Sequence, residues 1–307
     1  MSRGKRPPGQ TLAKFFGPSE YSLANLDRAV LYCQHYSAYN YPFEFWASLS
    51  YGVPDFFEER ARFQAALQAW GYDLITSADN KSLKGLIEEA REYFEECVLY
   101  APPFEEMRDA FRLTCFAKEF GQLLMWSHYA DGLRGFVVIF DERQLISGRD
   151  DSFFLDVSYS NAPPEVDTLL YGVLWDQEDY HLKVIEEERA NRKHRGEKGR
   201  LRENPDYKFV SDDALKRMRL MWQMVFATKP RGWKYERERR LLIHSDRTDS
   251  KPIFLDYPPS AVSEIVLGER MEASFRNQLL EIVGRRFPNA SVRTARRSQS
   301  NYSLTFE

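Results

Sequence analysis

The sequence predicts an α+β protein built on a mixed, largely antiparallel sheet with inserted helices. Short apolar strand patterns lie near both ends of the 307-residue chain, and helical patterns lie between them without the regular strand–helix alternation of a parallel sheet. Neither G-x-G-x-x-G nor G-x-x-x-x-G-K-S/T occurs, which argues against a Rossmann or P-loop domain. With 43% hydrophobic residues, the chain has enough apolar side chains for a large core.

The elements of the first half follow from local patterns. Apolar runs closed by turn residues predict strands, and apolar residues spaced three or four apart predict helices. In chain order we expect a strand at 12–16, a helix at 22–29 with Ser22 as its N-cap, a strand at 30–37, and two helices at 54–70 and 81–101 that form a helical insertion over about 54–110.

The second half contains the clearest strand, GFVVIFD at 135–141. Because it is apolar at nearly every position, we expect it to be central in the sheet and buried on both faces. MWSHYADG, just before it, is turn-rich. The remaining expected elements are a strand at 153–160, a helix at 165–188, a helix capped by Ser211 that ends near 229, strands at 239–244, 252–257 and 262–268, a helix at 270–287, and strands at 291–297 and 302–307.

The chain is expected to form a single catalytic-type domain over residues 11–307. The first ten residues, MSRGKRPPGQ, are basic, lack the apolar segment of a secretory signal and are expected to form a mobile arm. Dense mixed charge with almost no apolar residue predicts an exposed charged loop at about 186–208. A loop that contacts a substrate or partner is the alternative interpretation.

The overall composition excludes some function classes. The net charge of −3 gives no global electrostatic basis for binding nucleic acid or an anionic membrane. No run of about 18 apolar residues is present to span a bilayer. The three cysteines, Cys33, Cys97 and Cys115, are scattered and are interpreted as reduced thiols of a cytoplasmic protein. Neither C-x-x-C nor H-E-x-x-H spacing occurs, so no metal site is predicted.

The segment LLMWSHYADGLRGF, 123–136, is the first candidate binding site. It places Trp126, His128, Tyr129 and Arg134 within a short span that also contains two glycines. Tryptophan and tyrosine rings offer faces on which a flat aromatic ligand stacks, and an arginine offers a cation for a phosphate. The alternative is a structural corner with a buried tryptophan and satisfied polar groups.

The segment WKYERERRLLIH, 233–244, is the second candidate. If it is a strand throughout, side-chain alternation places Glu236, Glu238 and Arg240 on one face, with the Cα atoms of the two glutamates about 7 Å apart. Two carboxylates that close raise the pKa of one of them, while Arg240 holds the other ionised. The alternative is an exposed, salt-bridged strand edge.

The order of these segments resembles a widespread bacterial family of unknown function. The resemblance rests on LAKFF, SLANL, YNYPFEF, TCFAKEFGQLLMWSHYADGLRGFVVIFD, VSYS, K…GWKYERERRLLI and SEIVLG, and covers roughly residues 11–306. The blocks M-W-S-H-Y-A-D and W-x-Y-E-x-E-x-R are its most specific marks. Phe15 replaces a common tyrosine, Tyr41 stands where the family usually has aspartate, and the insertion from Pro54 to Pro103 is long, so ligand contacts at these places stay open.

The layout is also similar to that of the ADP-ribosyltransferase toxins, above all those that modify nucleic-acid bases. In that layout a first strand contacts the dinucleotide through a basic residue, a middle strand walls the nicotinamide, and a late strand carries the catalytic glutamate, in one clade as E-x-E. Lys14, the block from Cys115 to Tyr129, and the pair Glu236 and Glu238 fall in this order. The resemblance therefore implies an NAD-dependent ADP-ribosyltransferase with NAD as its co-substrate.

The resemblance implies a role for each candidate residue. Glu238 stabilises the oxocarbenium-like ribose as nicotinamide leaves, and Glu236 orients or deprotonates the acceptor. The residues expected to bind the cofactor are Lys14 and Arg134 at its phosphates, Phe15 beside Lys14 in the opening strand, Trp126 and Tyr129 at its rings, His128 at a ribose hydroxyl, and Arg240, which positions Glu238.

The implied biology is a cytoplasmic toxin of phage defence or of a toxin–antitoxin system, held in check by an antitoxin or chaperone. RNA, DNA or protein is the expected acceptor. The arginines between Arg285 and Arg297, with those at about 192–202, would supply a basic strip for nucleic-acid phosphates, unless they are ordinary surface arginines. Two other function classes stay open: a non-catalytic module that senses a nucleotide or a modified base, and a nucleotide hydrolase whose paired carboxylates hold a divalent metal.

Overall fold

The structure, a computed structural model, describes residues 10–39, 41–72, 80–197 and 205–307. The chain divides into two compact units: unit 1 comprises Met1–Phe45, Glu105–Ala162 and Lys229–Glu307, and unit 2 comprises Trp46–Phe104 and Pro163–Thr228. The helical insertion expected at about 54–110 supplies most of the first segment of unit 2. The expected mobile arm lies outside the described residues except for Gln10.

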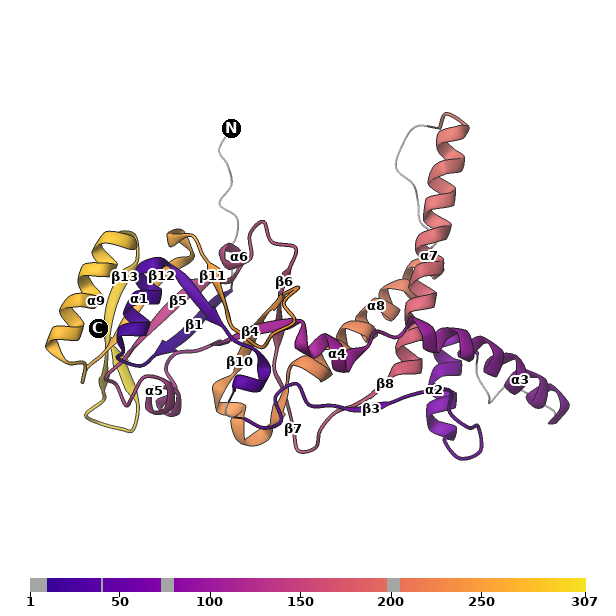
Figure 1. Ribbon diagram of the computed structural model, residues 1–307, viewed down its shortest axis with the longest axis horizontal. Helices are drawn as coiled ribbons and strands as arrows, with labels where there is room; N and C mark the ends of the chain where they lie inside the picture. The colour runs from indigo at the N-terminus through magenta and orange to yellow at the C-terminus, as the bar shows by residue number, and fades with distance from the viewer. Residues whose placement is uncertain (1–9, 40, 73–79, 198–204) are drawn as a thin grey trace. The chain divides into compact units, whose positions relative to one another are not determined.

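Unit 1 is built on an eight-stranded sheet with the order β14-β13-β12-β5-β1-β4-β10-β6 (Figure 1). Its pairings are antiparallel except that of β12 with β13, which is parallel. The predicted α+β class with a mixed, largely antiparallel sheet is therefore confirmed. The strands are β1 (Thr11–Phe16), β4 (Phe111–Ala117), β5 (Phe136–Asp141), β6 (Ser152–Asp156), β10 (Glu238–His244), β12 (Val262–Gly268), β13 (Ser291–Arg297) and β14 (Leu304–Phe306).

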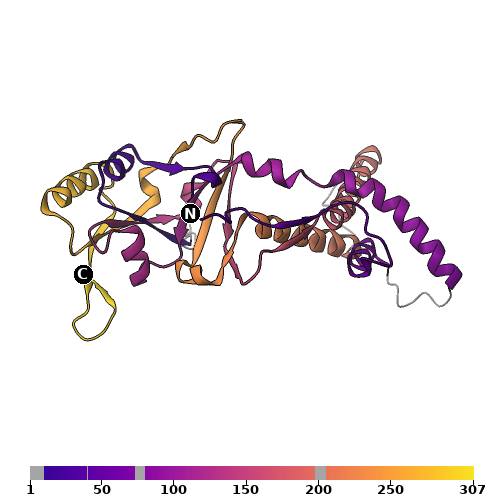
Figure 2. The same ribbon diagram turned by 60° about the horizontal axis from the view of Figure 1, so that its bottom comes forward.

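The strand β5 lies between β1 and β12, as its apolar sequence predicted. Its first five residues, 136–140, are buried, so both of its faces are covered by core side chains. On one face, α1 (Glu20–Arg28) and α9 (Ala273–Arg286) pack over Phe136, Val138 and Phe140. On the other face, α5 (Leu123–Tyr129) packs over Val137 and Ile139. Figure 2 shows the β13–β14 hairpin, in yellow, extending from the end of this sheet.

Two local predictions in unit 1 were wrong. Ser19, not Ser22, is the N-cap of α1, because the extended backbone of Ser19 lets its hydroxyl accept a hydrogen bond from the Ser22 backbone N–H. The Ser22 hydroxyl oxygen in turn accepts a hydrogen bond from the Ser19 backbone N–H, which completes a capping box. The MWSHY part of the turn-rich segment is the end of helix α5, and the turn follows at Asp131 and Leu133, both with positive φ.

The remaining short elements are not part of the eight-stranded sheet. The strand β2 (Val30–Cys33) pairs with β11 (Ile253–Asp256) in a separate antiparallel ladder. The others are η1 (Tyr36–Ala38), α4 (Phe104–Asp109), α6 (Glu142–Leu145), β7 (Ser158–Ser160), β9 (Thr228–Pro230), η4 (Arg231–Glu236) and η5 (Pro259–Ala261).

Unit 2 is mainly helical. Its elements are β3 (Ser48–Ser50), α2 (Arg60–Trp70), α3 (Asn80–Cys97), η3 (Val98–Tyr100), β8 (Glu165–Asp167), α7 (Thr168–His194) and α8 (Pro205–Phe226). A core of phenylalanines and small apolar residues joins α2, α3 and the first turns of α7, and β3 pairs with β8 in parallel. Among the described residues, no helix is both long enough and apolar enough to cross a bilayer.

Two boundaries in unit 2 differ from the prediction. Helix α7 continues to His194, although 186–194 was expected in the charged loop, because strong helix formers dominate there and basic residues suit a helix C-terminus. Residues 198–204 of that loop lie outside the described part of the chain. Helix α8 begins at Pro205, whose fixed φ suits a first helical position, so Ser211 lies inside the helix rather than at its cap.

Candidate functional site

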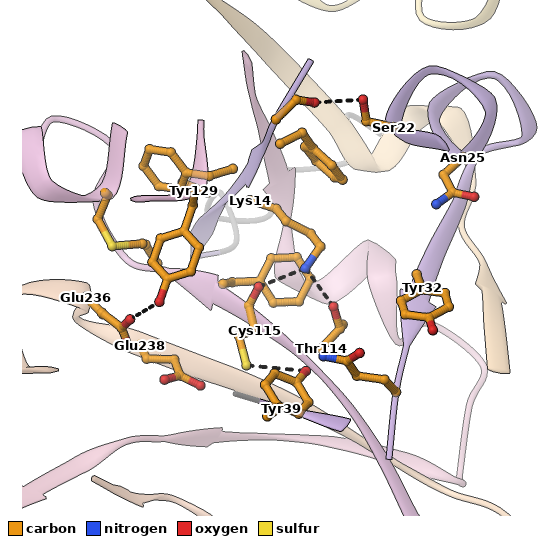
Figure 3. A pocket seen from close by; sticks show the side chains of 18 of the residues that line it. Lys14, Ser22, Asn25, Tyr32, Tyr39, Thr114, Cys115, Tyr129, Glu236 and Glu238 are labelled. Atoms are coloured by element: carbon orange, nitrogen blue, oxygen red, sulfur yellow. Dashed lines mark hydrogen bonds between the residues drawn. The ribbon is translucent and has the colours of Figure 1, made fainter. Parts of the chain in front are cut away.

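A cavity of about 690 Å³ lies in unit 1 where β1 and β4 separate (Figure 3). The strand β1 pairs with β5 along its full length, but its register on β4 has a single pair, Ala13 opposite Ala117. Beyond this pair, residues 14–16 of β1 and 114–116 of β4 line the cavity from its two sides. The site is therefore a split in the sheet, and volumes of this order suit small-molecule ligands.

Lys14 reaches across this split. Its Nζ donates to Oγ1 of Thr114 at 2.7 Å and to the carbonyl oxygen of Cys115 at 3.1 Å, groups on β4 that β1 leaves unpaired at this point. An ammonium group has three N–H donors, and the hydrogen bonds to described residues use two of them, so the third can meet a ligand in the cavity. Burial lowers the pKa of Lys14, and the nearby thiols and Glu238 oppose that shift.

Glu238, the first residue of β10, is the buried carboxylate of the cavity. Its Oε1 accepts from Nε of Arg240 at 2.7 Å, and its Oε2 lies 2.5 Å from Nζ of Lys229. Burial alone would raise the pKa of Glu238, but the charges of Arg240 and Lys229 outweigh burial and lower it. The carboxylate is thus held ionised at the cavity wall. The backbone N–H of Glu238 donates to the Tyr159 hydroxyl at 2.9 Å.

Glu236 also lines the cavity, but contrary to the prediction it does not lie on the strand that carries Glu238. It lies in the 3-10 helix η4, and Arg237, with φ of 44°, turns the chain into β10. Strand alternation therefore does not relate Glu236 to Glu238, and that part of the prediction was wrong. Even so, Glu236 accepts from the Tyr129 hydroxyl and from Nζ of Lys229, the latter at 2.9 Å. Burial raises the pKa of Glu236.

Glu44 is a third buried carboxylate, which the sequence reading missed. Its Oε1 lies 2.5 Å from Nη2 of Arg240, and its Oε2 accepts no hydrogen bond from the described residues although it is buried. Burial raises the pKa of Glu44, and the neighbouring Glu238 adds to this rise. The cluster thus contains three carboxylates and two cations, Lys229 and Arg240, and Glu44 offers an acceptor at the cavity.

The walls of the cavity are rich in aromatic side chains. Tyr129 lies on the side of Glu236, and Tyr39 lies below Cys115, whose thiol is 3.7 Å from the Tyr39 hydroxyl (Figure 3). Trp233 also lines the cavity. Tyr32 and Phe254 contact each other edge to face and line the side of helix α1. Aromatic faces on both sides suit a ligand with more than one flat ring.

The structure brings together five of the nine predicted site residues at the cavity: Lys14, Phe15, Tyr129, Glu236 and Glu238. Arg240 does not line the cavity but forms an ion pair with Glu238 from within the core.

Three predicted ligand contacts lie away from the cavity lining. Trp126 is buried in the core, where its indole N–H donates to the Phe120 carbonyl and its ring meets Phe15 edge to face. His128 is exposed on α5, and Arg134 is exposed and paired with Asp131. For the tryptophan, the alternative of a structural corner is the better description.

Ion pairs largely neutralise the described part of the predicted basic strip, and Arg200 and Arg202 lie outside the described residues. The pairs are Arg285 and Arg286 with Asp27, Arg293 with Glu264, Arg296 with Glu307, and Arg297 with Glu269. Arg192 and Arg195 likewise pair with Glu197. Asp27, Glu264 and Glu269 come from distant parts of the sequence, so the run of arginines alone could not predict these pairs.

Lys229 and Glu44 are the most important residues that sequence reasoning missed as site members. Both stand in segments that carried the family resemblance, Glu44 in YNYPFEF and Lys229 shortly before GWKYERERRLLI. The presence of a charged residue within or beside a segment that carries the resemblance could have identified both as candidate site residues. Within the described residues, no group of three or more His, Cys, Asp or Glu side chains is arranged to hold a metal ion.

Comparison with known proteins shows a similarity to a family model over part of the site. We found no match to the chain among curated proteins or among solved structures. Lys229, Glu236, Glu238 and Arg240 lie inside the region that matches a family model, whereas Lys14 lies outside it. Residues 125–241 match the family described as "Protein of unknown function (DUF2971)".

Proposed function

We propose that the protein is an NAD-dependent ADP-ribosyltransferase with Glu238 as its catalytic carboxylate. The observation that carries this proposal is the ionised Glu238, fixed by Arg240 and Lys229 at the wall of an aromatic cavity that Lys14 enters from the opposite strand. A fixed anion beside a cavity is suited to stabilising positive charge that develops on a substrate.

The cavity offers groups for each part of NAD. Lys14 has an N–H to donate to the diphosphate, and the rings of Tyr32 and Phe254 on the α1 side suit the adenine. The nicotinamide ribose would lie near Glu238, between Tyr129 and Trp233. The split between β1 and β4 supports this arrangement because it gives the dinucleotide access to three neighbouring strands.

The proposed reaction replaces nicotinamide by an acceptor atom. The bond between the nicotinamide nitrogen and the ribose breaks, its electron pair leaves with the neutral nicotinamide, and the ribose becomes oxocarbenium-like. Glu238 accepts a hydrogen bond from the ribose 2′-hydroxyl and stabilises this charge. The acceptor then bonds to the ribose carbon and releases a proton to Glu236, which acts as the general base; burial raises the pKa of Glu236, which favours its accepting a proton.

A transferase of this kind depletes NAD and modifies cellular targets, so a binding partner that restrains it, an antitoxin or a chaperone, is part of the proposal. Phage defence or a toxin–antitoxin system is the setting in which such an activity would be kept. The buried Lys229 holds the position between Glu236 and Glu238 that a bridging divalent cation would need, which favours the transferase over the nucleotide hydrolase.

The test uses NAD labelled in its adenylate part and measures both nicotinamide release and label transfer to nucleic acid or protein of a cell lysate. We expect Glu238→Gln to lower both rates by at least about 100-fold while NAD binding is kept. Glu142→Gln is the matched control, because Glu142 pairs with Arg239 on the other face of β10. A wild-type protein that neither binds nor consumes NAD would overturn the proposal.

A non-catalytic nucleotide sensor is the second candidate. Both oxygens of Glu238 already meet a cation, which is also what a purely structural carboxylate would show. Saturable NAD binding without nicotinamide release, unchanged in Glu238→Gln, would select the sensor.

A further inference from the structure

Six aromatic rings of unit 1 contact one another in series along one side of the cavity. In order they are Phe43, Tyr41, Trp233, Tyr235, His128 and Tyr129, with centroid separations of 5.8, 6.1, 6.2, 6.0 and 6.3 Å. We call this row the aromatic ridge. Three segments that are distant in sequence supply it, so it is a feature of the fold and not of one local motif.

The aromatic ridge connects the cavity with the surface. Its members Tyr41, Trp233 and Tyr129 also line the cavity, whereas Phe43, Tyr235 and His128 do not. Phe43 is 48% exposed and Tyr129 is 41% exposed. The row is partly open to solvent and ends at Tyr129, whose hydroxyl donates to Glu236, so a ligand that lies on these rings can reach the carboxylates of the cavity.

The charged residues around the aromatic ridge favour an anionic ligand. Arg231 and Lys234, on the same 3-10 helix as Trp233 and Tyr235, are exposed, and neither forms an ion pair with a described residue. Two acidic residues lie in the segments that supply the ridge, and both are buried in ion pairs: Glu44 with Arg240, and Glu236 with Lys229. Nearby Glu119 and Asp131 are paired with Arg237 and Arg134.

We propose that the aromatic ridge binds a single-stranded nucleic acid, which presents a base to Glu236 and Glu238. Unpaired bases stack on successive aromatic side chains, while neighbouring cations meet the phosphates. A duplex keeps its base faces covered and cannot use such a row. Only the transfer of ADP-ribose to the bound base rests on the proposed function. Binding of the nucleic acid to the ridge does not depend on it, because binding needs no NAD.

Direct binding separates this inference from the proposed activity. Fluorescence anisotropy without NAD would use labelled single-stranded RNA and DNA of about 12 nucleotides, with the matching duplex as comparison. We expect Tyr235→Ala and Phe43→Ala each to weaken single-strand binding by roughly 5- to 150-fold, the range of one lost base–ring stack. Tyr302→Ala, which removes a fully exposed ring in the turn before β14, is the control and should bind as the wild type.

The salt dependence tests the electrostatic part. Two phosphate contacts predict that log Kd rises with log salt concentration at a slope of about 1.4, and the double variant Arg231→Ala, Lys234→Ala should lose most of this slope. Comparison of the RNA and DNA arms tells which nucleic acid is preferred.

Failure of the inference and failure of the proposed function give different results. Single-strand binding that depends on the ridge, in a protein that ignores NAD, supports the ridge and overturns the transferase. NAD consumption without single-strand binding, or with binding that Tyr235→Ala and Phe43→Ala leave unchanged, overturns the ridge. Equal affinity for duplex and single strand also overturns it.

Discussion

Nη2 of Arg240 lies 2.5 Å from Oε1 of Glu44, so a residue of the loop after η1 is bound to the strand that carries the candidate catalytic carboxylate. The same guanidinium donates from Nε to Glu238. Arg240 thereby joins two buried carboxylates that would repel each other without it. The loop and the strand form one wall of the cavity because this arginine holds them together.

Arg240→Leu should cost about 3–5 kcal/mol of unfolding free energy, because it leaves two buried carboxylates without their shared cation. Urea denaturation followed by fluorescence measures this loss. The control is Arg239→Leu at the adjacent position of β10, where the ion pairs with Glu142 and Asp156 are less buried and the expected loss is about 1 kcal/mol. Equal losses in the two variants would contradict a special role for Arg240.

Glu44 predicts a pH dependence of stability with a definite sign. Burial, with a smaller contribution from Glu238, raises the folded-state pKa of Glu44 above its ordinary value of 4.5. A group with a raised folded pKa binds more protons in the folded state, so its contribution is present below pH 4.5 and is lost as pH rises through the folded pKa. The unfolding free energy of the wild type relative to Glu44→Gln should therefore fall from pH 4.5 towards pH 8. A difference that stays flat or grows with pH would contradict it.

The elements that the sequence predicted well are those whose structure is determined by residues close together in the chain. The apolar run at β5 predicted a central strand because a strand buried on both faces needs apolar residues at every position. The prediction of a charged loop at 186–194 was wrong, because helix propensity and not hydrophobicity decides whether an exposed segment is helical.

The site was predictable only in part, because its geometry depends on long-range contacts. The sequence correctly predicted that Glu236 and Glu238 lie close together. The reason given, side-chain alternation along one strand, was wrong, because the positive φ of Arg237 interrupts the strand between them. Lys229, which in fact joins the two carboxylates, comes from the short strand β9. Pairing between residues that lie far apart in the chain, such as Glu44 with Arg240, leaves no trace in composition or periodicity.

Gly135 should be intolerant of substitution for a steric reason. A Cβ at this position would lie 1.9 Å from the carbonyl oxygen of Phe16, at the end of β1 that borders the cavity. We expect Gly135→Ala to lower the unfolding free energy by at least about 2 kcal/mol, since backbone on both sides must move. Gly284→Ala in helix α9 is the control: nothing lies within 4 Å of the added methyl group, and alanine should stabilise the helix by about 0.5–1 kcal/mol. Chemical denaturation of both variants tests the contrast.

Lys14 should contribute to NAD binding more than to the chemical step. If its remaining N–H donates to the diphosphate, that contact is the same in the ground state and the transition state, so its loss raises KM and leaves kcat nearly unchanged. A charge-assisted hydrogen bond predicts a rise in KM of roughly 10- to 150-fold for Lys14→Met. Lys118→Met, at an exposed lysine paired with Asp156, is the control for loss of one positive charge. If Lys14→Met instead lowers kcat at constant KM, the ammonium acts on the reacting ribose and not on the phosphates, and the orientation proposed for NAD in the split between β1 and β4 is reversed.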